Sequence, residues 1–313
     1  MIKTLSDSVR SYPVAPVLIA LFVAFSLFSP YFMTSGNIEA LLTANSVVLI
    51  ASIGMTLVFL MGGIDLSIST VISVSAVTSG LVMAATGSVT LGALAALAVG
   101  LVFGLVNGLL IGVLGLTPFI TTMATQLIAR GIAFVLSKGI AVQGTPYSMI
   151  DFGFLTIAGI PAVTWVGLVV VGVCIVAMTQ TDWGRRVMLI GSNRNAARYS
   201  GINVRFTEVS VYAVSGLLGG IAGFISIATL GNAIPGVGDT LLLIVIGAVV
   251  LGGTTMEGGD GSIARTVLGV ALLAVLISGL NLMGIPFYDQ LIIQGLLIFF
   301  GTWLSMKLSA RRS

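Results

Sequence analysis

The sequence predicts an all-α integral membrane protein of about ten transmembrane helices with both termini in the cytoplasm. Of its 313 residues, 57% are hydrophobic and only 7% are charged, and the mean hydropathy is +1.17. A charged side chain in the hydrocarbon core costs about 3 kcal/mol or more, so a chain this poor in charge has lipid as its main solvent. The composition leaves hardly any room for a soluble domain, and residues 1–313 are expected to form a single transmembrane domain.

Apolar runs that can cross a bilayer follow one another along the whole chain. A crossing takes about 20 helical residues, and a backbone in lipid must satisfy its hydrogen bonds internally. No run alternates like a barrel strand, so each is expected to be a helix. The first apolar run lacks a clean cleavage motif and is expected to be a retained span. The expected spans are 14–33, 41–61, 66–85, 91–113, 118–136, 162–180, 208–229, 240–255, 264–283 and 288–306.

The basic residues predict the orientation, because short cytoplasmic loops carry an excess of Lys and Arg. With the N-terminus inside, ten spans put eleven of the thirteen basic residues in the cytoplasm, while Arg130 lies within a span and Lys138 outside. The net charge of +3 reflects this bias and requires no nucleic-acid partner. The eleven are Lys3, Arg10, Arg185, Arg186, Arg194, Arg198, Arg205, Arg265, Lys307, Arg311 and Arg312.

Two connections are longer than a turn: a main outer loop, 137–161, and a more highly charged inner loop, 181–207. Within the inner loop, residues 193–200 suit a short helix, capped by Asn193 and stopped by Gly201. Such a helix, lying across the inner face, can dock a soluble partner, and it can equally be a solvated basic loop that sets topology.

Several kinds of chemistry are excluded. The sequence has no histidine and one cysteine, Cys174, within an apolar run. Intrachain disulfides, cysteine metal clusters and histidine-dependent catalysis are therefore absent, and the thiol is expected to be a small buried side chain. No Gly-x-x-x-x-Gly-Lys-Ser/Thr loop occurs, so if ATP drives the protein, another chain binds it.

Four segments resemble the permeases of ribose-type sugar ABC importers. They occur in the family's order and run through nearly the whole chain. They are Gly62-Gly63-Ile64-Asp65-Leu66-Ser67, the stretch from Pro118-Phe119-Ile120 to Arg130-Gly131, the Gly-Arg-Arg…Gly-Ser-Asn…Ala-Ala-Arg-Tyr-Ser-Gly-Ile pattern of 184–202, and Val249 to Thr254 followed by Glu257-Gly258-Gly259.

This resemblance implies a ten-helix permease of type II ABC importer architecture in the bacterial inner membrane. Its implied partners are a second permease subunit, two cytoplasmic ATPases that hold ATP and magnesium, and a periplasmic sugar-binding protein that docks on 137–161 and 232–239. The permease itself binds no cofactor. The inner loop corresponds to the family's ATPase-coupling segment, although Asn195 stands where the family often has an acidic residue. The implied coupling residues are Asn193, Arg194, Ala196, Ala197, Arg198, Ser200 and Gly201.

Ionisable and polar residues inside spans are the candidates for a translocation path, because burying them without partners is costly. Asp65 lies between two spans and can either cap the following helix or line the path. Arg130 can extend to the outer headgroups or pair with Asp65 or another polar group. Asn107, Gln126 and Asn281 are expected to join helices, with sugar contact as the alternative. Gly100, Gly104 and Gly108, four residues apart, predict close helix packing.

The sequence fits two other function classes less well than an ABC permease. An ion-coupled secondary transporter tends to place carboxylates at mid-membrane, where only Asp65 is even near. A membrane-embedded enzyme needs a nucleophile, an acid–base pair or a metal cluster, and none can be assembled from these spans. Among ABC permeases, the cargo can also be a furanose signalling molecule or a nucleoside.

Overall fold

In a computed structural model the chain is described from residue 14 to residue 310, with side chains as far as residue 301. Seven helices are long and apolar enough to cross a membrane. They are α3 (Ser35–Leu60), α4 (Ile68–Thr86), α5 (Val89–Gly108) with its π-helical continuation η1 (Leu109–Val113), α6 (Pro118–Ser137), α8 (Ala162–Gln180), α11 (Val204–Leu230) and α13 (Ile263–Leu282). Three shorter apolar helices are α2 (Val14–Phe28), α12 (Leu241–Leu251) and the Phe287–Gly301 part of α14 (Phe287–Ala310). Each of these helices overlaps one of the ten expected segments, and seven of them have the length and apolarity of a membrane span.

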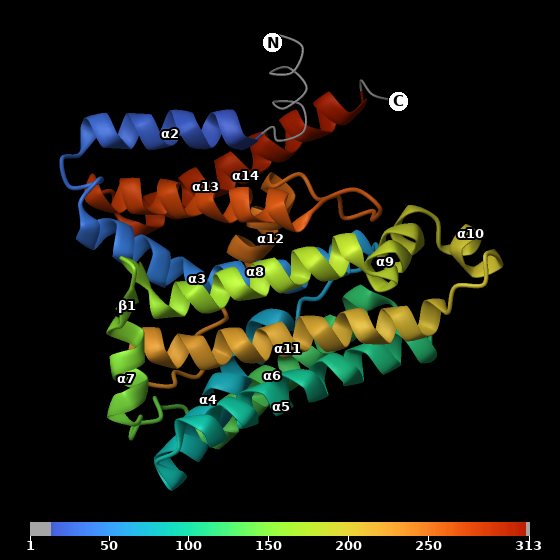
Figure 1. The fold of residues 1–313 in the computed structure, drawn as a ribbon, viewed down its shortest axis with the longest axis horizontal. Helices are drawn as coiled ribbons and strands as arrows, with labels where there is room; N and C mark the ends of the chain where they lie inside the picture. Colours follow the sequence, from blue (N-terminus) through green and yellow to red (C-terminus); the bar gives the residue numbers. More distant parts are fainter. Residues whose placement is uncertain (1–13, 311–313) are drawn as a thin grey trace.

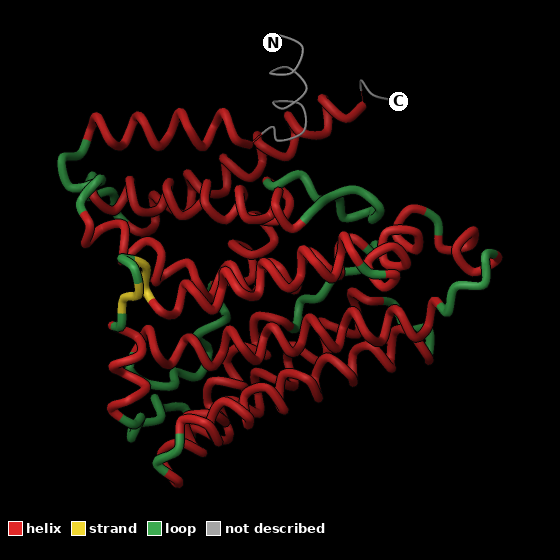
Figure 2. The backbone as a smooth tube through the Cα atoms, in the orientation of Figure 1, coloured by secondary structure: helices red, strands yellow, loops and turns green. Residues whose placement is uncertain are grey.

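The long helices lie side by side, with small elements at the two ends of the bundle (Figure 1). One end carries α7 (Tyr147–Phe154) and a short hairpin of β1 (Thr156–Ile157) paired antiparallel with β2 (Ile160–Pro161). The other end carries α9 (Asp182–Ser192) and α10 (Arg194–Tyr199). We call these the α7 end and the α10 end. Figure 2 shows that the loops gather at both ends but also run between helices within the bundle.

Two expected spans were too long. The first ends at Phe28, not at residue 33, because Pro30 lacks an amide proton and restricts Ser29. Thr34 then caps α3, which starts six residues before the expected 41. The span 240–255 shrinks to α12, since Gly252 and Gly253 end the helix and Gly253 adopts a φ of 86°. At 11 residues, α12 is about 16 Å long and covers about half of a hydrocarbon core.

The two loops contain more structure than the sequence reasoning predicted. The inner loop was expected to hold one short helix, but it also contains α9, whose buried face is Gly184, Val187 and Ile190. The outer loop contains α7 and the hairpin. The i, i+3 spacing of Val187 and Ile190 opposite Arg185 and Arg186 is the pattern that indicates an amphipathic helix.

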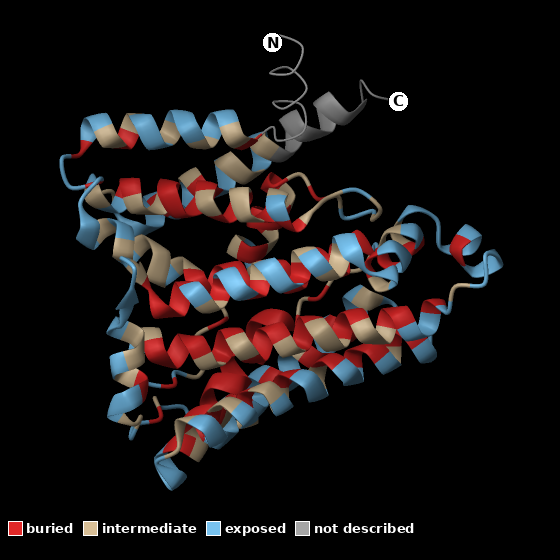
Figure 3. Ribbon diagram, in the orientation of Figure 1, coloured by how far each residue is buried: buried red, intermediate tan, exposed pale blue. Residues whose placement is uncertain are grey.

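The core lies around α3, α4 and α11, where buried residues concentrate, while α2 is largely exposed (Figure 3). The glycine row on α5 packs directly against α11, as predicted. A Cβ atom at Gly100 would lie 2.3 Å from the Gly216 carbonyl oxygen, and one at Gly104 would lie 2.4 Å from that of Tyr212. Without side chains on this face, the two backbones can touch.

α2 begins and α14 ends toward the α10 end of the bundle (Figure 1). The inner-loop arginines belong to α9, α10 and the start of α11 at the same end, whereas Lys138 directly follows α6. Four residues of the orientation prediction, Lys3, Arg10, Arg311 and Arg312, lie outside the described residues, as does the side chain of Lys307.

Candidate functional site

Asp65 lies in the segment between α3 and α4 and is only 1% exposed. Its Oδ1 accepts hydrogen bonds from the Ser67 amide at 3.1 Å and the Ser67 hydroxyl at 2.6 Å, and its Oδ2 accepts from the Ser215 hydroxyl of α11 at 2.8 Å. The carboxylate therefore caps the start of α4, one of the two roles expected for it. No arginine or lysine pairs with it among the described residues.

Hydrogen bonds extend this site across two more helices. The side-chain Nδ2 of Asn107 on α5 donates to the Ser67 hydroxyl at 2.8 Å, and the Thr125 hydroxyl of α6 donates to Oδ1 of Asn107 at 2.8 Å. The Tyr212 hydroxyl of α11 donates to the Ile64 carbonyl oxygen at 3.3 Å. Non-helical backbone inside a bundle is tolerated only where such partners satisfy it. The segment 61–67 is thus tied to α4, α5, α6 and α11.

A second loop, 231–240, folds inward from the α7 end. Gly238 is buried against α4, where its amide donates to the Ser73 hydroxyl at 3.0 Å. Asp239, just before α12, pairs with Arg130 of α6 at 3.0 Å. Arg130 therefore pairs with a carboxylate other than Asp65, and its guanidinium also lies 6.0 Å from the centre of the Phe134 ring. Each of the two loops thus places one carboxylate immediately before a helix.

α10 is held against the start of α11 by a two-point ion pair. Arg194 contacts Glu208 through Nη1–Oε1 at 2.6 Å and Nη2–Oε2 at 3.0 Å, and the Glu208 side chain is only 4% exposed. The predicted helix is present, with Asn193 capping it by accepting the Ala196 amide at 2.9 Å and Gly201 following it at a φ of 81°. Bidentate Arg–carboxylate pairs fix geometry as well as charge, so α10 has a defined position on α11.

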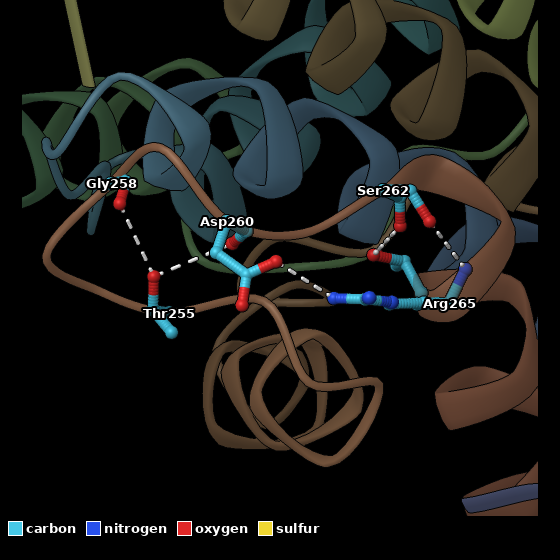
Figure 4. Close-up of polar contacts among 6 residues, drawn as sticks. Thr255, Gly258, Asp260, Ser262 and Arg265 are labelled. Atoms are coloured by element: carbon cyan, nitrogen blue, oxygen red, sulfur yellow. Dashed lines mark hydrogen bonds and ion pairs between the residues drawn. The ribbon is translucent and has the colours of Figure 1, made fainter. Parts of the chain in front are cut away.

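The connection 252–262 forms a compact loop at the base of α13 (Figure 4). Asp260 pairs with Arg265 at 3.0 Å, the Ser262 hydroxyl caps α13 by accepting the Arg265 amide at 3.2 Å, and the Thr255 hydroxyl lies 3.4 Å from the Gly258 and Asp260 carbonyl oxygens. These contacts give the loop a fixed shape, although it contains no regular secondary structure.

The same loop meets α3 and α9 backbone to backbone. The Gly259 amide donates to the Leu60 carbonyl oxygen at 3.0 Å. A Cβ atom at Gly191 of α9 would lie 1.9 Å from that oxygen and 2.6 Å from the Gly259 nitrogen. We call this contact of Leu60, Gly191 and Gly259 the glycine joint. It connects the element beside α10 to the end of α3, five residues before Asp65.

An open cavity of about 550 Å³ lies at the α7 end between α3, α7, α11 and α12. Its lining is mainly apolar, with Glu39 and Thr43 of α3 and Ser226 and Thr229 of α11 as polar members.

Comparison with known proteins assigns this architecture. Residues 37–301 match the family described as the permease component of branched-chain amino acid transport systems. The chain belongs to this permease family. No solved structure matches the permease.

Three curated relatives align with nearly the whole permease. The ribose import permease protein RbsC of Bacillus subtilis is 36% identical over 94% of this chain and 92% of its own. The D-allose transport system permease protein AlsC of Escherichia coli is 32% identical over 97% of this chain and 93% of its own. The L-arabinose transport system permease protein AraH of Escherichia coli is 34% identical over 92% of this chain and 88% of its own. The permease is therefore similar to sugar permeases over more than nine tenths of its length.

The predicted path residues of the permease do not gather in one place. Asp65 and Asn107 share a buried network, Arg130 joins α6 to the 231–240 loop, and Asn281 accepts a hydrogen bond at 2.8 Å from Gln290 of α14. Gln126 is half-buried on α6 and makes no side-chain hydrogen bond within the described part of the chain. Asn107 and Asn281 thus join helices as expected, and a role in translocation stays a prediction for all five.

The predicted coupling residues do lie together on α10. Ala197 is buried at 4% exposure, Ala196 and Arg198 are exposed, and the Ser200 hydroxyl donates to the Ala196 carbonyl oxygen at 2.9 Å. Arg194 is not a free charge available to a partner, because Glu208 already pairs with it. Whether these residues contact an ATPase stays a prediction.

Sequence reasoning missed Glu208, Tyr212 and Ser215. They recur at i, i+4 and i+7, so they lie on one face of α11. Glu208 pairs with Arg194, whereas Tyr212 and Ser215 both bind the 61–67 segment. A carboxylate at such a position in an apolar helix is the signal that identifies this face, because an unpaired charge there is costly.

Proposed function

We propose that this chain is the transmembrane permease subunit of an ATP-driven ABC importer, and that it moves a monosaccharide delivered by a periplasmic binding protein across the bacterial inner membrane. The similarity of almost the whole chain to ribose, allose and arabinose permeases carries this proposal. The chain performs no bond chemistry, and separate ATPase subunits bind ATP and magnesium and hydrolyse ATP.

The proposed arrangement has ten crossings within one transmembrane domain, 1–313, with both termini and the 181–207 segment in the cytoplasm. The seven long and three shorter apolar helices of the described residues support it, as does the position of the start of α2 and the end of α14 toward the α10 end (Figure 1). The permease pairs with a second permease subunit, the binding protein docks over 137–161 and 232–239, and two ATPases dock at the α10 end.

α10 is the proposed contact with the ATPase. It stands at the end of the bundle with Ala196 and Arg198 exposed, and the Arg194–Glu208 pair transfers its movement to α11. On α11, one helical turn separates Glu208 from Tyr212, which holds the Ile64 carbonyl oxygen next to Asp65. A shift of α10 therefore acts on the loop between α3 and α4, where the bundle opens alternately to the two sides.

The sugar enters at the α7 end in this mechanism. The cavity of about 550 Å³ there is large enough for a monosaccharide, and Glu39 and Thr43 offer hydrogen-bonding groups among apolar walls. The binding protein selects the sugar, so the permease needs few strong ligand groups.

A bulky side chain on the exposed face of α10 tests the proposal. We expect Ala196→Trp to prevent α10 from entering a cleft on the ATPase, and to lower both ATPase co-purification and monosaccharide uptake by about tenfold, the loss of roughly 1.4 kcal/mol of contact energy. Ala196→Ser is the matched control and is expected to behave as the parent. Full uptake by the Trp variant with bound ATPase would disprove the coupling role of α10.

A further inference from the structure

The α10 end carries a second cavity, of about 430 Å³, and the proposed transport mechanism gives the space inside it no ligand. One wall is the end of η1 and the turn after it, Gly112 to Gly115, and the other is α10 with the start of α11. Backbone contact between η1 and α11 closes its floor, since a Cβ atom at Gly112 would lie 2.9 Å from the Arg205 carbonyl oxygen.

Three arginines line this cavity: Arg194, Arg198 and Arg205. Glu208 neutralises Arg194, but neither Arg198 nor Arg205 pairs with a carboxylate within the described part of the chain. No acidic residue is among the lining residues. The cavity therefore offers two uncompensated guanidinium groups to an anion.

Exposed apolar side chains flank the arginines. Leu114 lines the cavity and is 67% exposed, and Phe206, next to Arg205, is 63% exposed. Leu114 directly follows the apolar helix that ends at Val113, and Phe206 lies in the first turn of α11, where a membrane-spanning bundle meets the headgroup layer. A small soluble anion uses only the arginines, whereas an amphiphile with an anionic head and acyl chains uses both features.

We propose that this cavity binds the phosphate headgroup of an anionic phospholipid. Arg198 and Arg205 hold the phosphate by charge-assisted hydrogen bonds, and the acyl chains lie along Leu114 and Phe206. The bound lipid bridges η1 and α10, so anionic lipid stabilises the position of α10 relative to the bundle. The proposal holds whatever the cargo is, and its test uses neither ATP nor sugar.

The test compares phosphatidylglycerol with phosphatidylcholine on the purified full-length permease, by native mass spectrometry of retained lipid. The parent is expected to retain phosphatidylglycerol preferentially. The Arg198→Gln/Arg205→Gln variant is expected to lose about 30-fold in affinity for it, as two arginines of about 1 kcal/mol each imply. Arg186→Gln removes an exposed charge outside the cavity, and this variant is expected to bind phosphatidylglycerol as the parent does. Arg198→Lys/Arg205→Lys keeps both charges and is expected to retain most of the phosphatidylglycerol binding.

Three results would overturn the proposal. The first is equal phosphatidylglycerol retention by the Arg198→Gln/Arg205→Gln variant and the parent. The second is displacement of the lipid by inorganic phosphate, which would make this a site for free anions, and the third is displacement by purified ATPase, which would make the cavity part of the ATPase interface. Failure of this test leaves the Ala196→Trp prediction standing, because Ala196 does not line the cavity.

Discussion

Asp65 is a buried carboxylate whose described partners are all donors of hydrogen bonds. The Ser67 amide, the Ser67 hydroxyl and the Ser215 hydroxyl all point at its two oxygens, and no cation balances it among the described residues. The three donors offset part of the cost of burying the carboxylate. Asp65 thus holds the α3–α4 loop against α11 by accepting a hydrogen bond from Ser215.

Asp65→Asn removes one accepting oxygen and introduces an amide that faces a donor. We expect a loss of about 1–3 kcal/mol in the free energy of unfolding, the cost of an unsatisfied buried group. Thermal unfolding of the purified protein in detergent measures it. Asp260→Asn is the control, because its ion pair with Arg265 is 57% exposed on the carboxylate side and is worth under about 1 kcal/mol. Equal stability of Asp65→Asn and the parent would mean that the carboxyl group already carries a proton.

At the scale of elements, the contact of α5 with α11 determines how closely the bundle packs. Glycines on both helices bring backbone atoms together, and Gly216 mirrors the α5 row, since its Cβ atom would lie 2.3 Å from the Gly100 carbonyl oxygen. Packing in lipid depends on such close approach because apolar side chains gain little by leaving apolar solvent.

Replacement by alanine is expected to have opposite effects on stability at a glycine of the α5 row and at a glycine of α6. In Gly104→Ala the new Cβ meets the Tyr212 carbonyl oxygen at 2.4 Å, so the helices must separate, and we expect a loss of about 1–3 kcal/mol. Gly131→Ala on α6 has nothing within 4 Å and is expected to gain up to about 1 kcal/mol from helix propensity. Unfolding midpoints of the two variants against the parent decide the matter, and a tolerated Gly104→Ala would show that this contact is not rigid.

Hydrophobicity was sufficient to predict the long apolar helices, and local chemistry was sufficient for the Asn193 cap, the Gly201 stop and the glycine row on α5. Long-range partners could not be predicted. That Arg130 pairs with Asp239 depends on the 231–240 loop folding back between α4 and α6, and no local pattern specifies this. α9 escaped prediction because its apolar face is short and its arginines resemble a solvated loop.

At the scale of the whole molecule, the two ends of the bundle differ in charge. Arginines of α9, α10 and the start of α11 gather at the α10 end. α7 carries Asp151 and no basic residue, and Glu39 lies in the cavity beside α7. This asymmetry is the structural counterpart of the positive-inside bias.

Cysteine labelling tests which end faces the cytoplasm. Cys174 is the only cysteine and is buried, so Cys174→Ala gives a cysteine-free parent. In that background we expect Asn195→Cys on exposed α10 to react with a membrane-impermeant maleimide in inverted vesicles and not in intact cells. Tyr147→Cys on α7, at a side chain 84% exposed, is expected to show the reverse. Labelling of Asn195→Cys from outside would refute the orientation and, with it, the docking of an ATPase on α10.

The glycine joint has a mechanical consequence. A contact made of side chains can yield by changing rotamers, whereas Leu60, Gly191 and Gly259 meet through main-chain atoms that have no rotamers. The glycine joint is therefore stiff. When α9 is displaced, we expect the last turn of α3 to move by a similar distance, because local relaxation can absorb little of the displacement.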